Sequence, residues 1–242
     1  MKNIGIIGGM GPEATSDQYM KIVRYYQKNF GAKYDKDFPA MIIYSVPIPD
    51  VVENMENEKK TLRMLSDAAK LLEKGGSDFI VIACNTVQFL LKRLRKNVEI
   101  PIIGIAEVSS KYVKTNGYEK VGILGTNATV FDKEVYDNDF QKVGVKLIKP
   151  RKENQNKVTR IIMNQLADRT TEKERRDLRE VIQSLNSRGS EAILIACTDL
   201  PPIISQENFE IPIIDCTQIY ADEAARLSTF KSKSNNNVGG NR

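Results

Sequence analysis

The sequence predicts an α/β protein made of two similar halves, each with a parallel sheet and related to the other by pseudo-twofold symmetry. Two observations carry this prediction. Short, almost continuously apolar runs alternate with longer amphipathic stretches, as expected for buried parallel strands connected by helices. Three landmarks also occur twice in the same order, at offsets of 117, 113 and 111 residues. The 242 residues are enough for two small domains with cores of their own.

Each apolar run has the length of a single strand. We expect strands over 3–7, 39–45, 78–83, 101–105, 120–124, 145–149, 191–196 and 211–214. Amphipathic stretches of helical length lie between them. We expect helices over 14–28, 57–74, 86–96, 129–143 and 172–188, and a solvated loop leading into a helix over 152–160.

The internal repeat indicates a duplication. NIGIIGGMGPEAT at 3–15 resembles KVGILGTNATV at 120–130, and VEIPIIGIAE at 98–107 resembles FEIPIIDCTQ at 209–218. Two homologous α/β halves explain this order better than a solenoid array. We assign 1–104 together with 213–230 to a first domain, 105–212 to a second domain, and 231–242 to a disordered tail.

Composition excludes several functional classes. Charged residues are 28% of the chain and apolar runs are far shorter than the ~20 residues of a membrane span, so we expect a cytoplasmic protein. The net charge of +5 comes from bases interspersed with acids, which argues against a nucleic-acid groove. Three cysteines, no CxxC and no histidine argue against a metal site, a disulfide scaffold and a histidine-dependent triad.

Cys84 and Cys197 end two nearly identical apolar runs, GGSDFIVIAC and RGSEAILIAC. A single cysteine of this kind is most simply a small packing residue, as we interpret Cys216. Two cysteines at equivalent strand ends indicate function, because ligands of open parallel sheets bind beyond the carboxyl ends of the strands. A helix start after each cysteine would lower the thiol pKa without histidine.

Polar residues follow both cysteines. Asn85 and Thr86 follow the first, and Thr198 and Asp199 follow the second. They are typical helix N-cap residues, and the same groups can hold a substrate carboxylate or amine.

The stretch GGMGPEAT at 8–15 is a glycine-rich turn between a strand and a helix. It satisfies a loose dinucleotide fingerprint, but the acidic residue expected after the second strand is missing. A small-anion site around Gly9 and Met10 explains the turn better. The equivalent turn of the second half offers Thr126, Asn127 and Thr129 as donors.

Together these motifs resemble the aspartate/glutamate racemase family, and most closely its aspartate racemase branch. The resemblance rests on IGIIGGMGP, VPIPD, GGSDFIVIACNT, LGT, ACTDLP and IPIID, and it covers nearly the whole chain. It implies an isomerase without a cofactor, two α/β domains with the active-site cleft between them, a small amino-acid substrate and a homodimer.

The resemblance also implies the chemistry. Inversion at Cα requires a proton to leave one face and another to arrive at the opposite face. Cys84 and Cys197 would be the two acid/bases. Gly9, Met10, Asn85, Thr86, Thr126, Thr198 and Asp199 would bind the substrate.

The chain departs from the family pattern in several places. Gln88 stands where the family has histidine, Asp199 where it has glutamate, and Val51 where the aspartate branch has an arginine. Lys157 and Arg160 are the candidates for the family's second basic residue. The loss of a bidentate arginine contact bears on specificity for aspartate.

Two alternatives remain open at this stage. One is a maleate isomerase-like enzyme that uses a cysteine as a nucleophile on an alkene. The other is a bilobed protein that binds an acidic metabolite without turnover.

Overall fold

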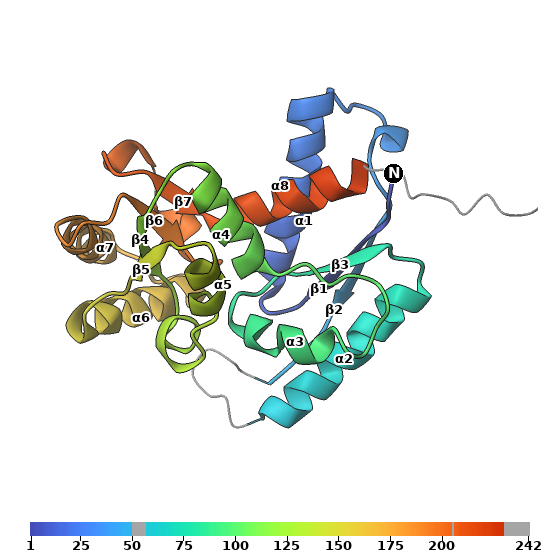
Figure 1. The fold of residues 1–242 in the computed structure, drawn as a ribbon, viewed down its shortest axis with the longest axis horizontal. Coiled ribbons are helices and arrows are strands. Elements are labelled where there is room, and N and C mark those ends of the chain that lie inside the picture. Colours follow the sequence, from blue (N-terminus) through green and yellow to red (C-terminus); the bar gives the residue numbers. More distant parts are fainter. Residues whose placement is uncertain (50–56, 205, 230–242) are drawn as a thin grey trace, which may run out of the picture.

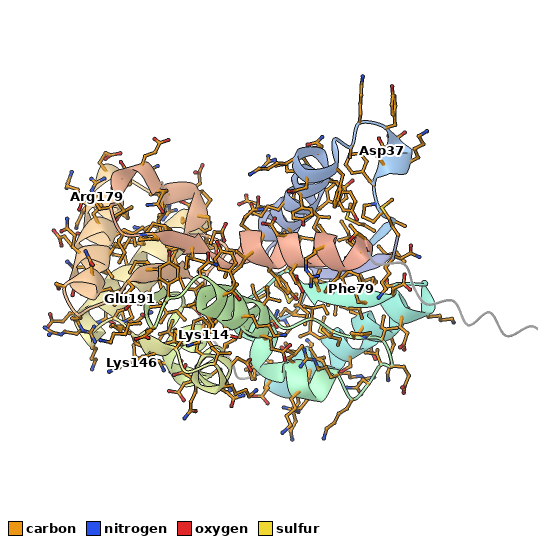
Figure 2. The ribbon with its side chains drawn as sticks, turned by 45° about the horizontal axis from the view of Figure 1, so that its top comes forward. Asp37, Phe79, Lys114, Lys146, Arg179 and Glu191 are labelled. Atoms are coloured by element: carbon orange, nitrogen blue, oxygen red, sulfur yellow. The ribbon has the colours of Figure 1, made fainter. Side chains whose placement is uncertain are left out.

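The two predicted halves form two parallel sheets that lie side by side (Figure 1). The structure is a computed structural model, and it describes residues 1–49, 57–204 and 206–229. No helix in these ranges has both the length and the apolar character needed to cross a bilayer. Long charged side chains, such as those of Lys146 and Arg179, extend from the periphery of the second half (Figure 2).

The first sheet has the strand order β2-β1-β3. Its strands are β1 (Ile4–Gly8), β2 (Met41–Ser45) and β3 (Phe79–Ile82). Ile4 pairs with Phe79 across β1 and β3, and a single parallel bridge joins Ile80 to Ile102 on the free side of β3. β1 and β3 are buried along their whole lengths, which explains their continuous apolar sequence.

The second sheet has the order β5-β4-β6-β7. Its strands are β4 (Lys120–Leu124), β5 (Lys146–Ile148), β6 (Ala192–Ile195) and β7 (Ile213–Asp215). Val121 pairs with Ala192, and Ile193 pairs with Ile213. These pairs are the sequence equivalents of Ile4–Phe79 and Ile80–Ile102, so the register confirms the duplication.

Helices connect the strands and cover both sheets. Pro12 opens α1 and Gly31, at φ 62°, ends it. Thr171 and Glu174 form a capping box at the start of α7. The α-helices are α1 (Pro12–Phe30), α2 (Glu58–Lys74), α3 (Leu91–Leu94), α4 (Ile105–Thr115), α5 (Asp137–Lys142), α6 (Lys152–Leu166), α7 (Glu172–Asn186) and α8 (Cys216–Thr229). Short 3₁₀ turns lie at Asp35–Asp37, Thr86–Leu90, Pro201–Ile203 and Gln206–Asn208, and a π-turn lies at Ala128–Asp132.

The buried hydrophobic side chains of the described residues form three clusters. One cluster packs α2 against the first sheet, and a second packs α6 and α7 against the second sheet. The third joins both sheets through α1, α4 and α8. α8 packs against α1 and α4 between the two sheets (Figure 1), so the helix that follows β7 is part of the contact between the halves.

The sheet pairing bears on the predicted domain boundaries. β7 belongs to the second sheet by its hydrogen bonds, although the boundary at 213 places it in the first domain. α8 packs on α1 of the first half. The assignment of 1–104 with 213–230 to one domain and of 105–212 to the other stays a prediction. The predicted tail lies outside the described residues.

Several predicted elements need correction. The expected strand 101–105 is reduced to the bridge between Ile80 and Ile102. The Tyr220 hydroxyl lies between the Ile82 N–H and the Ile103 carbonyl, and α4 begins at Ile105. The helix 129–143 is divided, with Glu134 at φ 45° between the π-turn and α5. The helix 86–96 is a 3₁₀ turn followed by α3. The expected loop at 152–160 is already helical.

Candidate active site

The two cysteines occupy equivalent places at the ends of the central strands. Cys84 follows β3, and Cys197 follows β6. Both are buried, with 7% and 4% of their surfaces exposed. Cys84 precedes the 3₁₀ turn at Thr86–Leu90, whereas the expected helix after Cys197 is only a turn at Pro201–Ile203. The predicted pairing with helix starts therefore holds in part.

Burial determines the protonation state of Cys84. It raises the thiol pKa to about 11, and the charge of Asp199 adds to this effect. The backbone N–H groups of Val87 and Thr86 act in the opposite direction. The helix-start donors that the sequence predicts are thus present, but the expected low thiol pKa is wrong because desolvation outweighs them.

Cys197 is subject to the same balance. Burial raises its pKa well above the usual value, and the Asp199 carboxylate raises it further. The Cys197 thiol donates a hydrogen bond to Asp199 Oδ2 at 3.5 Å. Burial also raises the pKa of Asp199. The charge of Asp199 therefore raises the pKa of both thiols, and its carboxylate is hydrogen-bonded to Cys197.

Asn85 makes contacts that the sequence does not indicate. It is 4% exposed, and its side chain does not cap the turn that follows. Its Oδ1 instead accepts a short hydrogen bond from Tyr136 and a 3.5 Å hydrogen bond from the Cys216 thiol. Two donors at Oδ1 leave Nδ2 as the free end of the amide, and Nδ2 has no hydrogen-bond partner among the described residues.

A cluster of threonines joins the two halves beside Cys84. The Thr86 hydroxyl lies 3.1 Å from that of Thr129 and 3.4 Å from that of Thr126. Thr126 donates to Thr129 at 2.9 Å, and all three residues are buried. The structure therefore brings Thr86, which follows β3, and Thr126, which follows β4, together across the two halves.

The glycine-rich turn contributes less than predicted. The Gly9 N–H donates to Thr15 Oγ1 at 2.8 Å, so the turn uses this donor internally. Gly9 has φ +91°, and a Cβ at this position would lie 2.6 Å from Val46 N. Met10 packs against the hydrophobic cluster that contains Cys84. The Asn127 side-chain amide donates hydrogen bonds to the Asp132 carboxylate.

A cavity of about 320 Å³ adjoins the second cysteine motif. Thr198 and Asp199 line it, together with the first turns of α1 and the end of β7. Its charged lining residues are Glu13, Asp17, Lys21, Asp199 and Asp215.

Lys21 is the one cation among the described residues that line this cavity, and it is already paired. Its Nζ lies 2.7 Å from Asp17 and 2.8 Å from Asp215, and it also donates a short hydrogen bond to Thr217. Although burial lowers the pKa of Lys21, the two carboxylates more than compensate and raise it above the usual value. The cavity therefore carries excess negative charge.

A larger cavity of about 760 Å³ lies beside α4 and α8, and includes Glu107, Lys111 and Asp222 in its lining. None of the predicted site residues lines it. We take the cavity of about 320 Å³ as the candidate substrate site because two predicted site residues, Thr198 and Asp199, line it.

The two basic residues that were candidates for a substrate contact form ion pairs outside the candidate site. Lys157 pairs with Glu180 at 2.7 Å, and Arg160 pairs with Asp177, so both are engaged between α6 and α7. Val51 lies outside the described residues. Gln88 is buried, accepts a hydrogen bond from the Ile105 N–H at 3.3 Å, and donates to the Ile82 carbonyl at 3.4 Å.

No group of three or more histidine, cysteine, aspartate or glutamate side chains in the described ranges is arranged to hold a metal ion.

Comparison with known proteins identifies the family. Residues 7–224 match the Asp/Glu/Hydantoin racemase family. The chain belongs to this family of racemases. It is 29% identical to the broad specificity amino-acid racemase RacX of Bacillus subtilis, covering 94% of this chain and 97% of that protein. The predicted family and the fold class are therefore confirmed.

Solved structures support the same assignment. An aspartate racemase homologue from Pyrococcus horikoshii OT3 superimposes with a TM-score of 0.83 at 29% identity, covering 95% of this chain and all of that chain. The aspartate racemase of Picrophilus torridus gives 0.78 at 28% identity, with 94% of each chain covered. Glutamate racemase from Francisella tularensis, at 17% identity and a TM-score of 0.66, shares the fold.

Some neighbours of the site were missed from the sequence. Tyr136, Cys216, Tyr220 and Lys21 all contact the site or the segments that carry it. Each comes from a segment far from its partner in the chain, and no local motif marks it. Cys216, whose equivalent in the first half is Ile105, is interpreted from the sequence as a packing residue.

Proposed function

We propose that this protein is a cofactor-independent amino-acid racemase in which Cys84 and Cys197 are the acid/base pair. The single observation that carries the proposal is the placement of two buried thiols at equivalent strand ends, with Asp199 acting on both. We infer that the pseudo-twofold relation of the halves places these thiols on opposite sides of one substrate, as required by a reaction that must reach both faces of one carbon atom.

The reaction needs one thiolate and one thiol. The thiolate removes the α-proton, so that an S–H bond forms and the Cα–H electron pair moves into the adjacent carboxylate. The opposite thiol then donates its proton to the other face of Cα and becomes the thiolate. The roles are exchanged for the reverse direction, and proton exchange with water resets the pair.

The surrounding donors suit the charge that develops. The carbanionic intermediate places extra negative charge on the α-carboxylate, which preorganised donors stabilise. Asn85 Nδ2 is buried and unpartnered among the described residues, and is therefore the strongest candidate for this contact. The hydroxyls of Thr86, Thr126 and Thr198 are further candidates.

Thiolate formation is the demanding step. With the pKa of Cys84 at about 11, the thiolate is about 10⁻⁴ of the population near pH 7, which corresponds to about 5 kcal/mol. A bound α-ammonium group would favour the thiolate by charge, because an opposite charge within a few ångströms lowers an acid's pKa. Substrate binding is thus expected to activate the base.

The family resemblance favours aspartate or a related acidic amino acid as the substrate. Aspartate racemases among the structural relatives support this choice. A homodimer is the assembly that the resemblance implies, and light scattering of the purified protein tests it.

The charge of the cavity favours a second candidate for the substrate. Four carboxylates and one paired ammonium line the space beside Cys197, and they would repel an acidic side chain. A neutral or basic side chain is compatible with this lining. The broad specificity of the Bacillus subtilis relative agrees with this second candidate.

A panel of D- and L-amino acids in heavy water tests the proposal. We expect solvent deuterium at Cα, with racemisation, and without pyridoxal phosphate. Exchange with aspartate supports the first substrate, and exchange with lysine or alanine but not aspartate supports the second. Absence of exchange with every amino acid would contradict racemisation. A covalent succinyl adduct on a cysteine after incubation with maleate would favour the isomerase alternative.

A further inference from the structure

We propose that α8 positions Cys84 through Tyr220 and Cys216. Tyr220 is hydrogen-bonded to the backbone of Ile82 before this thiol, and Cys216 to the side chain of Asn85 after it. The inference rests on the proposed function of Cys84. Tyr220 and Cys216 are four residues apart on one helix and therefore lie on the same face. They are positioning residues, because they act on Cys84 through Ile82 and Asn85.

The first contact is a tyrosine hydroxyl inserted into a β-ladder. The Ile82 N–H donates to Tyr220 Oη at 3.1 Å, and the same hydroxyl donates to the Ile103 carbonyl at 2.7 Å. Two residues earlier, the backbones are hydrogen-bonded directly. The Ile80 N–H donates to the Pro101 carbonyl, and the Ile103 N–H donates to the Ile80 carbonyl. Parallel pairing would next join Ile82 to Ile103, and Tyr220 occupies this position.

The duplicated half lacks this insertion. β6 and β7 continue in direct register through the pair Ile195–Asp215, which corresponds to Ile82 and Gly104. The first half is therefore opened by one hydroxyl at the end of the strand that carries its cysteine. Because the two halves are otherwise alike in register, we infer that the inserted Tyr220 hydroxyl sets the distance between the end of β3 and the segment at 101–103.

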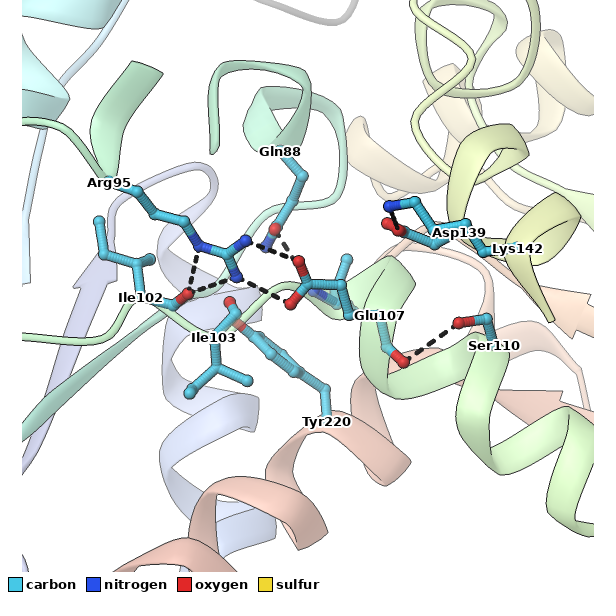
Figure 3. Close-up of polar contacts among 10 residues, drawn as sticks. Gln88, Arg95, Ile102, Ile103, Glu107, Ser110, Asp139, Lys142 and Tyr220 are labelled. Carbon is cyan, nitrogen blue, oxygen red and sulfur yellow. Dashed lines mark hydrogen bonds and ion pairs between the residues drawn. The ribbon is translucent and has the colours of Figure 1, made fainter. Parts of the chain in front are cut away.

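The residue before the acceptor of the Tyr220 hydroxyl is held by a side chain from outside the strand. Arg95 donates to the Ile102 carbonyl at 2.7 and 2.9 Å, and it binds Glu107 through two hydrogen bonds of 2.6 and 2.8 Å. Figure 3 shows Arg95 between Ile102 and Glu107, with Tyr220 beside Ile103. The segment at 101–103 is thus anchored, and the hydroxyl transmits that position to Ile82.

Ile82 is in turn coupled to Cys84. The Cys84 N–H donates to the Ile82 carbonyl at 2.8 Å, and Gln88 donates to the same oxygen at 3.4 Å. Gln88, at the position of the family's histidine, therefore binds the strand end and, through its other amide atom, the first residue of α4. Both backbone groups of Ile82 are fixed by side chains or by the cysteine loop.

The second contact of α8 lies one turn earlier. The Cys216 thiol donates to Asn85 Oδ1 at 3.5 Å. α8 begins directly after β7, which pairs with the strand that carries Cys197. One helix therefore connects the Cys197 sheet to residues on both sides of Cys84, and it sets one thiol relative to the other.

Tyr220→Phe is the main test, with Tyr26→Phe as its matched control. Tyr26 is also a buried tyrosine bonded to α8, but through Ser228 and Ala225 at the far end of the helix. We expect Tyr220→Phe to lower kcat roughly ten- to a hundredfold with KM changed less than about threefold, because misplacement of a reacting group lowers turnover. Tyr26→Phe should keep the wild-type kcat. Equal kcat values in the two variants would overturn the inference.

A second readout does not depend on turnover. Alkylation of Cys84 and Cys197 by iodoacetamide, followed by mass spectrometry, gives the ratio of the two rates without substrate. Tyr220→Phe should change this ratio at least about threefold, whereas Tyr26→Phe should not. An unchanged ratio would overturn the positioning role. If the wild-type protein racemises no amino acid, the proposed function fails while the ratio still decides the role of α8.

The Cys216 variants remain informative if Tyr220→Phe does not fold. Cys216→Ala removes the donor to Asn85, and Cys216→Ser restores a donor of similar size. We expect Cys216→Ala to change the alkylation ratio and Cys216→Ser to return it towards the wild-type value. Identical behaviour of both variants and the wild-type protein would contradict the inference.

Discussion

Asp199 controls the acidity of both thiols, and Asp199→Asn tests this role. The substitution removes one negative charge and keeps the size of the side chain. Asp199 Oδ2 lies 3.5 Å from the Cys197 sulfur and accepts a hydrogen bond from its thiol. Both the charge and this hydrogen bond favour the protonated thiol. The variant should therefore lower the pKa of Cys197 and, to a smaller extent, that of Cys84.

The magnitude follows from the distance. Two unit charges about 3.5 Å apart interact by about 5 kcal/mol at an effective dielectric constant of about 20. Solvent screens part of this energy because Asp199 is only half-buried. We therefore expect a fall of about one to two pKa units at Cys197, which is a ten- to hundredfold rise in the thiolate fraction below its pKa.

The assay is the alkylation rate of each cysteine between pH 7 and 10, measured by mass spectrometry. We expect the pH profile of Cys197 to shift to lower pH by more than that of Cys84. Glu207→Gln is the control, because it removes a carboxylate from the exposed turn at Gln206–Asn208. A Cys197 profile that does not shift in Asp199→Asn, or that shifts equally in the control, would refute this reasoning.

Three further predictions concern stability and the site. The pKa of Cys84 is about 11 in the folded protein and about 9 in an exposed thiol. The protonated thiol therefore contributes fully to the free energy of unfolding below pH 9, and about 3 kcal/mol of this contribution is lost towards pH 11. Urea titrations at pH 8 and 10.5 measure this loss, which should be smaller in Cys84→Ala. Thr171→Ala removes the capping box of α7 and should cost about 1 kcal/mol in urea unfolding, with Thr170→Ala as a control that keeps the cap. Gly9→Ala places a Cβ against Val46 at positive φ, so we expect a melting temperature several degrees lower and a large loss of activity, whereas Gly31→Ala should leave activity unchanged.

Much of the fold follows from the sequence because the duplication repeats its strongest signals. The apolar runs to Cys84 and Cys197 predict β3 and β6. The offsets of the repeat match the equivalent pairs Ile4–Phe79 and Val121–Ala192 that the structure shows. The sequence gives no sign that 101–105 does not form a full strand, because the hydroxyl that interrupts its pairing with β3 belongs to Tyr220, more than a hundred residues later. Side chains that reach across the fold leave no local pattern.

The sequence predicts that Cys84 and Cys197 follow two strands, as they do in the structure, but it misses much of what surrounds them. Asn85 looks like a cap in the sequence, but its amide binds Tyr136 and Cys216 from other parts of the chain. The protonation of the thiols could not be judged from helix starts alone, because burial is a property of the assembled halves. The interpretation of Cys216 as a packing residue is correct for its burial and misses its hydrogen bond.

The central claim is that two thiols divide the chemistry at Cα between opposite faces. The most direct measurement follows deuterium exchange and inversion of one accepted amino acid, offered separately as its L and D forms, by Cys84→Ser and Cys197→Ser. We predict that both variants lose racemisation, and that any residual exchange occurs with one enantiomer in one variant and with the opposite enantiomer in the other. Wild-type racemisation by either variant would contradict the account.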